Sequence, residues 1–406
     1  MTGIIIPDGG TIGSASDTDA ISVASDGKVT LSQPVGGTLT LSGDFVPATP
    51  LSHRNIVING AMQVSQRGTS FTGFGASVNW SLDRFFTYHN SDGAFTISQE
   101  SSVVPTGFKN SLKILITTAD ASLTATQRLI VGTRCEGNVV SHLNWGTSNA
   151  ETVTLSFYVR SSITGTHGGA INNGSDNRSY PFTYTINSNN TWERKSITVA
   201  GDQSGTWATD NGRSLQVIWG LGAGGSFSAS AGAWGAGDIS SATGATTAVL
   251  GTVDSTWYLS GVQLEVGNVA TPFEHRSYAD ELQRCMRYYT VLASIVGTGY
   301  QNGTTQLIVP IGDGGVKDPS NSAATSIGSV PFRATPTISG TLGSASFANH
   351  SGSAEFTSNT LSTIIVSTTG TITLTASSTF NTNGQNDNSS MSCYYNGKTI
   401  DCSAEF

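Results

Sequence analysis

A change of hydrophobic period inside residues 256–289 constrains this chain more than any other feature. Side chains from Thr256 to Val266 alternate between two faces, which is the period-two pattern of a β-strand. Beyond Gly267, apolar residues recur every three or four positions from Tyr278 to Leu292, which is typical of an amphipathic helix. One stretch therefore closes a β-rich region and starts a short helix.

The predicted helix spans residues 276–292. Ser277 suits the N-cap, and Asp280 occupies the position where a capping box carries its acid. Two heptads are too short for an independent coiled coil, so the apolar row packs either around a threefold axis or against its own chain. Both alternatives are open. The candidate oligomer contacts are Tyr278, Leu282, Cys285 and Tyr289.

Composition indicates an all-β protein. Only 11% of the residues are charged, and 48 of the 406 residues are glycine, which does not suit a helical cytosolic enzyme. Apolar residues still make up 37% of the chain and recur at strand spacing, which argues against disorder. No run of 18 apolar residues and no signal peptide is present.

Residues 51–275 show strand patterns separated by turns about every ten residues. TVTLSFYVR at 152–160 is a clear case, because its Val, Leu and Phe residues alternate with polar ones. We expect a jelly-roll β-sandwich. The other predicted strands are 112–117, 180–186, 191–199, 214–221 and 256–266. The Gly- and Ala-rich residues 222–254 are predicted to form a long loop with Trp234 as its one large anchor.

Three motifs carry a family resemblance. They are RNIVINGAMQVSQRG at 54–68, LDRF at 82–85 and VQLEVGNVATPFEHRSYADELQRCMRYY at 262–289. In this order they resemble tail fibre proteins of tailed bacteriophages, especially those of marine cyanobacteria (cyanophage or marine podophage type). The resemblance implies a homotrimeric virion tail protein that is synthesised in the cytoplasm of the bacterial host. VPFRATPT at 330–337 resembles a motif in the terminal domains of the same proteins.

The resemblance also implies a domain order. Residues 1–50 are too few to bury a core and would anchor the fibre to tail adaptor or nozzle proteins. Residues 51–275 would form the jelly-roll domain, and 276–292 the helix or linker. Residues 293–406 would form a β-sandwich-like C-terminal domain at the receptor-binding tip. Its predicted strands are 305–311, 336–342, 361–366, 370–377 and 391–395.

The central domain is also similar to jelly-roll carbohydrate-binding modules. Their opening and closing strands match residues 55–63 and 257–264 here. In those modules an acidic pair at these places often holds a structural calcium. This chain has Gln63, Ser260 and Gly261 instead, which lack the charged oxygens that calcium favours. We therefore predict no metal ligands and no cofactor, and whether a structural calcium is bound is left open.

Charge and cysteine content exclude other classes. The net charge is −8 and no basic patch is apparent, so nucleic-acid binding is not expected. No CxxC pair suggests a zinc site, and free thiols are expected in a reducing cytosol. Whether Cys393 and Cys402 bridge a C-terminal hairpin is left open.

Catalytic constellations are weak. The aspartates Asp176, Asp202, Asp210 and Asp238 lie in Gly-, Asn- and Ser-rich turns, where aspartate is common for conformational reasons. We therefore predict no enzyme and no catalytic residues; the alternatives are a tail-spike depolymerase and a stand-alone carbohydrate-binding module. Glu274–His275–Arg276 is interpreted as an interface or capping element.

Sugar binding is the favoured function, with a host glycan such as lipopolysaccharide or capsule as the partner. Such sites stack aromatic rings on sugars and surround them with amide, carboxylate and guanidinium groups. The aromatic candidates are Trp80, Tyr88, Trp145, Tyr180, Trp207, Trp234, Tyr394 and Tyr395. The predicted receptor residues are Asn383, Gln385 and Asp387 in the polar segment 381–390, then Tyr394 and Tyr395, with Trp234 as a second location.

Overall fold

The computed structural model describes residues 52–291 without interruption, separate strands within 11–31 and 306–403, and Glu405. The chain divides into two units, Met1–Pro50 and Leu51–Phe406. In the first unit, β1 (Thr11–Ser14), β2 (Asp17–Val23) and β3 (Val29–Leu31) form an antiparallel sheet.

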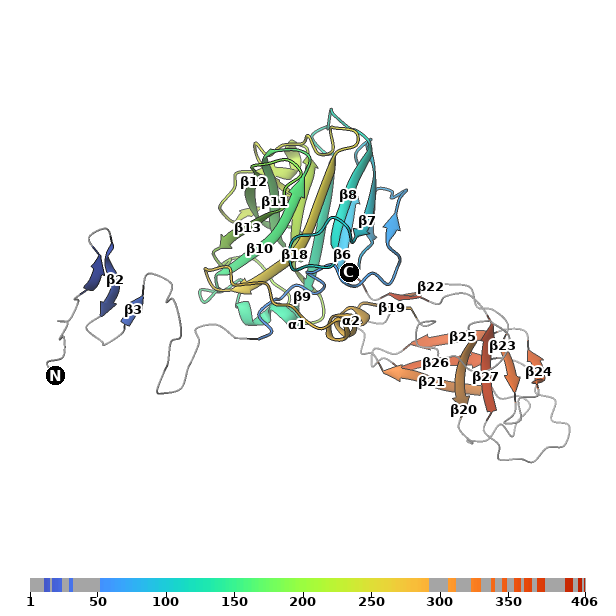
Figure 1. Cartoon of the computed structure of the whole chain (residues 1–406). Helices are drawn as coiled ribbons and strands as arrows, with labels where there is room; N and C mark the ends of the chain where they lie inside the picture. Colours follow the sequence, from blue (N-terminus) through green and yellow to red (C-terminus); the bar gives the residue numbers. More distant parts are fainter. Residues whose placement is uncertain are drawn as a thin grey trace, which may run out of the picture. The chain divides into compact units, whose positions relative to one another are not determined.

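Residues 52–291 form a sandwich of two antiparallel sheets (Figure 1). The six-stranded sheet has the order β13–β10–β18–β8–β7–β4, and the seven-stranded sheet has the order β16–β12–β11–β14–β9–β6–β5. The strands of the first are β4 (Ser70–Phe71), β7 (Ala94–Glu100), β8 (Ser111–Thr118), β10 (Val153–Ser161), β13 (Glu193–Val199) and β18 (Thr256–Val266). Those of the second are β5 (Val78–Trp80), β6 (Phe85–His89), β9 (Arg128–Glu136), β11 (Gly165–Asn173), β12 (Arg178–Ile186), β14 (Arg213–Ala223) and β16 (Gly235–Ala236).

The core lies between the two sheets. On β10 the apolar residues from Val153 to Val159 alternate and are fully buried, as the period-two pattern predicted. Trp219 of β14 and Trp257 of β18 are also fully buried and pack against each other from opposite sheets. Each large apolar side chain buried here contributes about 1.5–3 kcal/mol. Because the chain passes repeatedly from one sheet to the other, the all-β, jelly-roll-type expectation is confirmed.

The segment after β14 has little regular structure, as its composition predicted. It contains a 3₁₀ turn at Gly225–Phe227 and the two-residue strands β15 (Ser228–Ala229) and β17 (Ser241–Ala242). A Cβ atom at Gly168 or Gly220 would clash with Ser241 of this segment, so these glycines allow the segment to lie on the seven-stranded sheet. The remaining short helices are α1 (Gly137–Val140) and a 3₁₀ turn at Ser141–Leu143.

The helix α2 (Tyr278–Met286) is shorter than predicted. Ser277 is its N-cap, and its hydroxyl accepts a hydrogen bond from the Asp280 N–H, as expected. The prediction that the helix continues to residue 292 is wrong, because β19 (Tyr289–Val291) follows and pairs with β28 (Asp401–Ser403). The local apolar spacing could not anticipate a strand partner from 110 positions further along the sequence.

The later strands form three small antiparallel sheets. β20 (Gln306–Ile311), β25 (Leu361–Val366), β26 (Thr371–Ala376), β27 (Met391–Asn396) and β22 (Thr337–Ser339) confirm the predicted runs. Sequence reasoning missed β21 (Ala323–Ser329), β23 (Ala345–Ala348), β24 (Ala354–Ser358) and β28. The suggested hairpin between the last two cysteines is wrong, because β27 pairs with β20 and β23, while β28 pairs with β19 and β22.

Candidate functional site

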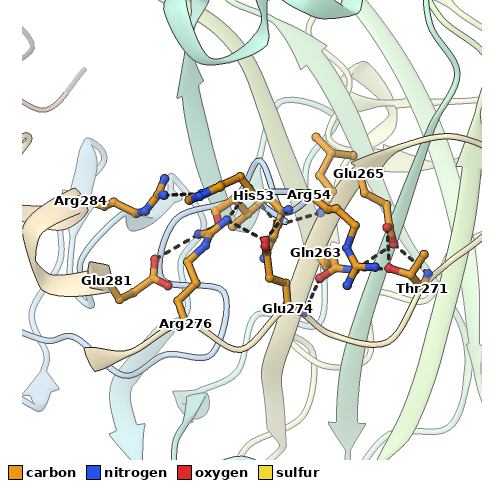
Figure 2. A network of polar contacts seen from close by, with 12 residues as sticks. His53, Arg54, Gln263, Glu265, Thr271, Glu274, Arg276, Glu281 and Arg284 are labelled. Atoms are coloured by element: carbon orange, nitrogen blue, oxygen red, sulfur yellow. Dashed lines mark hydrogen bonds and ion pairs between the residues drawn. The ribbon is translucent and has the colours of Figure 1, made fainter. Parts of the chain in front are cut away.

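A polar network joins the beginning of the central domain's sequence, near residues 53–59, to its end, near residues 263–284 (Figure 2). The Asn55 N–H donates to Glu274 Oε2 over 2.9 Å, and the Asn59 N–H donates to Glu281 Oε1 over 2.5 Å. Arg276 donates to the carbonyl oxygens of Val57 and Asn55. The motif at 54–68 and the motif at 262–289 therefore meet in space, although about 200 positions separate them.

The charged residues of this network have structural roles. Burial would raise the pKa of Glu274, but the Asn55 amide and the Arg276 guanidinium outweigh it and lower that pKa. Glu265 accepts hydrogen bonds from the N–H and hydroxyl of Thr271, which holds the segment that follows β18. These contacts agree with the interpretation of Glu274–His275–Arg276 as a capping element.

The positions that correspond to a calcium site are engaged in other contacts. The Gln63 carbonyl oxygen accepts a hydrogen bond from the Gln99 amide, and the Ser260 hydroxyl donates to the Asn110 carbonyl. Gly261 has a φ of 59°, and a side chain there would clash with Phe108. In the part of the chain that the structure describes, no group of three or more His, Cys, Asp or Glu side chains is arranged to hold a metal ion.

A buried ionic cluster lies beside α2. The Arg84 guanidinium, with 1% of its side chain exposed, pairs with Glu405, whose side chain is 3% exposed. It also lies 3.5 Å from the ring centroid of Tyr288. Burial would lower the pKa of Arg84, but the Glu405 charge outweighs it and raises that pKa. Arg67 approaches the same carboxylate to 3.5 Å.

The predicted oligomer contacts are not equally accessible. Tyr278 is 55% exposed and Leu282 is half-buried. Cys285 and Tyr289 are buried within the chain, so their apolar surface already has a partner. Only the first two remain available on the surface of a single chain, and the oligomeric state stays a prediction.

Trp234 belongs to a cluster of aromatic rings. Its ring packs edge-on against Trp145, Trp207 and Tyr180, with centroid distances of 5.3 to 5.5 Å. Its indole N–H donates to the carbonyl oxygen of Ala200 over 2.7 Å. This packing helps to hold residues 222–254 on the sandwich, but the prediction that Trp234 is their one large anchor is wrong, because Val249 and Leu250 are fully buried in the core and Trp234 is half-buried. A receptor role for Trp234 stays a prediction.

Each of the four turn aspartates already has a partner. Asp176 binds Arg213 and Gln216, and Asp238 binds Arg128. Asp202 pairs with Arg178 and also accepts from the indole N–H of Trp207. Asp210 accepts from the N–H of Gly212. Turn geometry and ion pairing account for all four carboxylates.

The outward side of the seven-stranded sheet carries a different kind of surface, which we call the Trp80 face. Trp80 packs edge-on against Phe86 at 5.5 Å, and Tyr88 lies beside them. Phe86 fits here because its ring lies where a side chain at position 132 would be, and residue 132 is glycine. Trp80 and Tyr88 are half-buried, so part of each ring is open to solvent.

A row of planar polar groups adjoins these rings. The Arg134 guanidinium lies 5.7 Å from the Trp80 ring centroid and donates to Gln216 Oε1 over 3.2 Å. Gln216 and Arg213 both donate to the Asp176 carboxylate. Burial, together with a smaller effect of the nearby Arg213 charge, lowers the pKa of Arg134 to about 10. Arg134 is therefore a cation at neutral pH. Arg134 and Gln216 are themselves buried, with 8% and 4% exposure, whereas Arg213 and Asp176 are half-buried. The hydrogen-bonding groups of this row that are open to solvent are therefore those of Arg213 and Asp176.

The Trp80 face spans four adjacent strands, β5, β6, β9 and β14. At about 4.8 Å between neighbouring strands, the Trp80 face is about 14 Å wide across these strands. Sequence reasoning named Trp80 and Tyr88 as aromatic candidates but missed Arg134, Gln216 and Arg213. Only the register of β9 and β14, which aligns Gln216 with Arg134, brings these residues together.

The predicted receptor tip is placed only in part. Asn383, Gln385 and Asp387 lie outside the described residues. Tyr394 and Tyr395 lie on β27, which has β20 and β23 as neighbours. The receptor role of all five stays a prediction. None of the helices in the described part of the chain is long and apolar enough to span a bilayer.

No family model matches this sequence. No curated protein matches it either. Among solved structures, it is similar to the enzymatically active domain of tailspike protein 4 of bacteriophage CBA120, at 9% identity and a TM-score of 0.29, over 52% of this chain and 21% of that one. It is also similar to a family 11 carbohydrate-binding module from Clostridium thermocellum, at 10% identity and a TM-score of 0.25, over 50% of this chain and 98% of that one.

This chain therefore spans about a fifth of the tailspike chain. Similarity at this level does not carry over an activity or a ligand.

Proposed function

We propose that this protein binds glycans through the Trp80 face and acts as a phage tail fibre in host attachment. The observation that supports glycan binding is that the half-open Trp80 and Tyr88 rings adjoin the buried Arg134–Gln216 pair, which holds the half-buried Asp176 and Arg213. Aromatic rings bind the apolar faces of sugars, and planar polar groups bind their hydroxyls. The tail fibre role comes from the motifs that resemble such proteins.

Each hydrogen bond to a neutral sugar contributes only about 1 kcal/mol net, so one site binds weakly. Three linked copies would raise the avidity by about two orders of magnitude or more. The homotrimer that the resemblance implies would supply these three copies. Host attachment through a glycan such as lipopolysaccharide or capsule would then depend on multivalency.

The test of the Trp80 face is binding of the full chain to host cells and to host-derived polysaccharide. Trp80→Ala should reduce binding at least tenfold, and Asp176→Asn should reduce it by a smaller factor. Asp210→Asn is the matched control, because it removes the same charge from an exposed turn outside the face. Folding is checked by melting temperature. Unchanged binding in folded Trp80→Ala would refute this location.

The C-terminal tip is the second location that we propose for the receptor site. It is tested by replacing Gln385, Asp387, Tyr394 and Tyr395 with alanine in one folded chain. Loss of adsorption in this variant, with normal adsorption in Trp80→Ala, would place the receptor at the tip. The reverse result would place it on the sandwich.

We also propose that the chain binds glycan without cleaving it, since the four turn aspartates have structural partners. The depolymerase alternative would be favoured if the chain released reducing sugar from host capsule and a variant with one carboxylate replaced did not. A stand-alone carbohydrate-binding module would instead be a monomer by light scattering.

Two proposals concern assembly. Residues 1–50 form a unit of their own, which supports an anchor to tail adaptor or nozzle proteins. A chain that starts at Leu51 should stay soluble and trimeric and should fail to attach to virions; insolubility would argue against an anchor. Leu282→Asp should abolish the trimer if the half-buried Leu282 contacts a second copy. A folded trimer of this variant would rule out that contact.

A further inference from the structure

A band of alternating aromatic and basic side chains crosses the outward side of the six-stranded sheet. Tyr258 of β18 is paired in register with Arg160 of β10 on one side and with Lys113 of β8 on the other. Trp192 directly precedes β13, which pairs with β10, and its ring centroid lies 6.1 Å from that of Tyr258. We call these four residues the basic band. They occupy one row because the register of four neighbouring strands aligns them.

The two cations of the basic band lie against the same ring. The Arg160 guanidinium carbon is 5.0 Å from the Tyr258 ring centroid, and the Lys113 ammonium nitrogen is 5.7 Å from it. These cation–π contacts hold both groups at fixed positions. They also cover the Tyr258 ring, which belongs to a residue with only 4% exposure. Two like charges therefore flank the Tyr258 ring on the outward side of the sheet.

Neither cation is neutralised by an ion pair within the described residues. Arg160 donates to the Asn190 carbonyl, and Arg194, exposed on the next row of the same face, donates to the Thr271 carbonyl. Glu100 lies on this face too, but its carboxylate accepts hydrogen bonds from Ser101 and Ser102. Lys113 makes only a lesser contribution to the lowered pKa of Glu100. Around Tyr258 this face thus carries two cations without an ion-pair partner among the described residues. Glu265, further along β18 on the same side, is bound by Gln263 and Thr271.

The aromatic component points to a sugar rather than to a simple anion. Trp192 is half-buried, so part of its ring is available for stacking beside Arg160. Its indole nitrogen is shielded from solvent and has no hydrogen-bond partner among the described residues. A ring for stacking next to Arg160, with Lys113 further along the same row, fits a pyranose that carries a negative group.

We propose that the basic band binds an acidic saccharide, whose pyranose ring contacts Trp192 and whose anionic group binds the cations that flank Tyr258, Arg160 and Lys113. A carboxylate, a sulfate or a phosphate on the sugar would satisfy the same two cations. The Trp80 face lies on the other sheet, so this site is independent of the proposed function and widens the range of ligands to charged glycans.

The test is affinity electrophoresis of the full chain in gels that contain polygalacturonate, dextran sulfate or neutral dextran. We expect retardation by at least one of the two anionic polymers, but not by dextran, and weaker retardation at higher salt. Which polymer retards the chain identifies the anionic group. Lys113→Gln and Trp192→Ala should each reduce affinity for that polymer by about tenfold, whereas Trp80→Ala should not.

Lys109→Gln is the matched control, because Lys109 is an exposed lysine in the loop before β8 and its replacement removes the same charge. Equal losses in Lys109→Gln and Lys113→Gln would show a general charge effect and overturn the proposal. Binding that is unchanged in Lys113→Gln and Trp192→Ala, or absent with both anionic polymers, would also overturn it. Host-cell binding of Trp80→Ala tests the Trp80 face only. Retardation of Lys113→Gln and Trp192→Ala in the gels tests the basic band, so the two proposals can fail separately.

Discussion

The pair formed by Arg84 and Glu405 gives the sharpest stability prediction. Glu405→Gln retains the side-chain size and removes the negative charge. Because only 1% of the Arg84 side chain is exposed, the variant would leave a cation in the interior without its counter-ion. Removing one partner of a buried ion pair costs about 3–5 kcal/mol of unfolding free energy.

We expect the lower end of this range, about 3 kcal/mol. Arg84 keeps a second acceptor, the Arg134 carbonyl oxygen at 2.5 Å, and its contact with the Tyr288 ring. Replacing both Arg84 and Glu405 with methionine should restore most of the loss, since an apolar pair of similar volume avoids the desolvation of two charges. Recovery in the double variant would assign the loss to the unpaired charge rather than to altered packing.

The assay is denaturation by guanidinium chloride followed by tryptophan fluorescence. All seven tryptophans lie between Trp80 and Trp257, so the signal reports unfolding of the central sandwich. Asp238→Asn is the control, because its ion pair with Arg128 has a carboxylate that is 33% exposed and should contribute about 1 kcal/mol or less. A loss in Glu405→Gln no larger than in this control would refute the reasoning.

Three further predictions concern the sandwich. Gly261→Ala should lower the unfolding free energy by about 1–3 kcal/mol in the same assay, because an added Cβ would lie 2.7 Å from the Phe108 ring; an unchanged midpoint would contradict this. Burial would raise the pKa of Glu193, but hydrogen bonds, first from Lys195, lower it from 4.5 to about 2. The ionised Glu193 carboxylate therefore stabilises the fold above pH 4.5, and this stabilisation is lost as the pH falls toward 2. In Glu193→Gln, the melting temperature should fall less steeply over this pH range than in the unaltered protein. Burial raises the pKa of the Cys135 thiol to about 12 and that of Cys285 well above its ordinary value. Neither should react with maleimide in the native chain at pH 8 by peptide mapping, and labelling of either before unfolding would show that the burial is wrong.

The strands of the sandwich were predictable because their signal is local. The alternation in residues 152–160 and 256–266 depends on one sheet face being buried, and β10 and β18 lie at these positions. The N-cap at Ser277 was predictable for the same reason, since a cap involves residues within one turn. Beyond Met286 the local pattern failed, because pairing of Tyr289 with Ser403 replaced the helix.

Long-range contacts account for the rest. No pattern near residue 84 indicates that its guanidinium would be buried against Glu405, 321 positions away. In the same way, Trp80 and Tyr88 were recognisable as aromatic candidates from their residue types. Arg134 and Gln216 joined them because strand register aligned four strands from distant parts of the chain. The local sequence thus determined the strand period, the helix cap and the turns of this protein. Tertiary structure decided its polar and aromatic sites, through the packing of the sheets and the pairing of β28 with β19. The contacts in those sites join residues far apart in the sequence, so they exist only once the chain is folded.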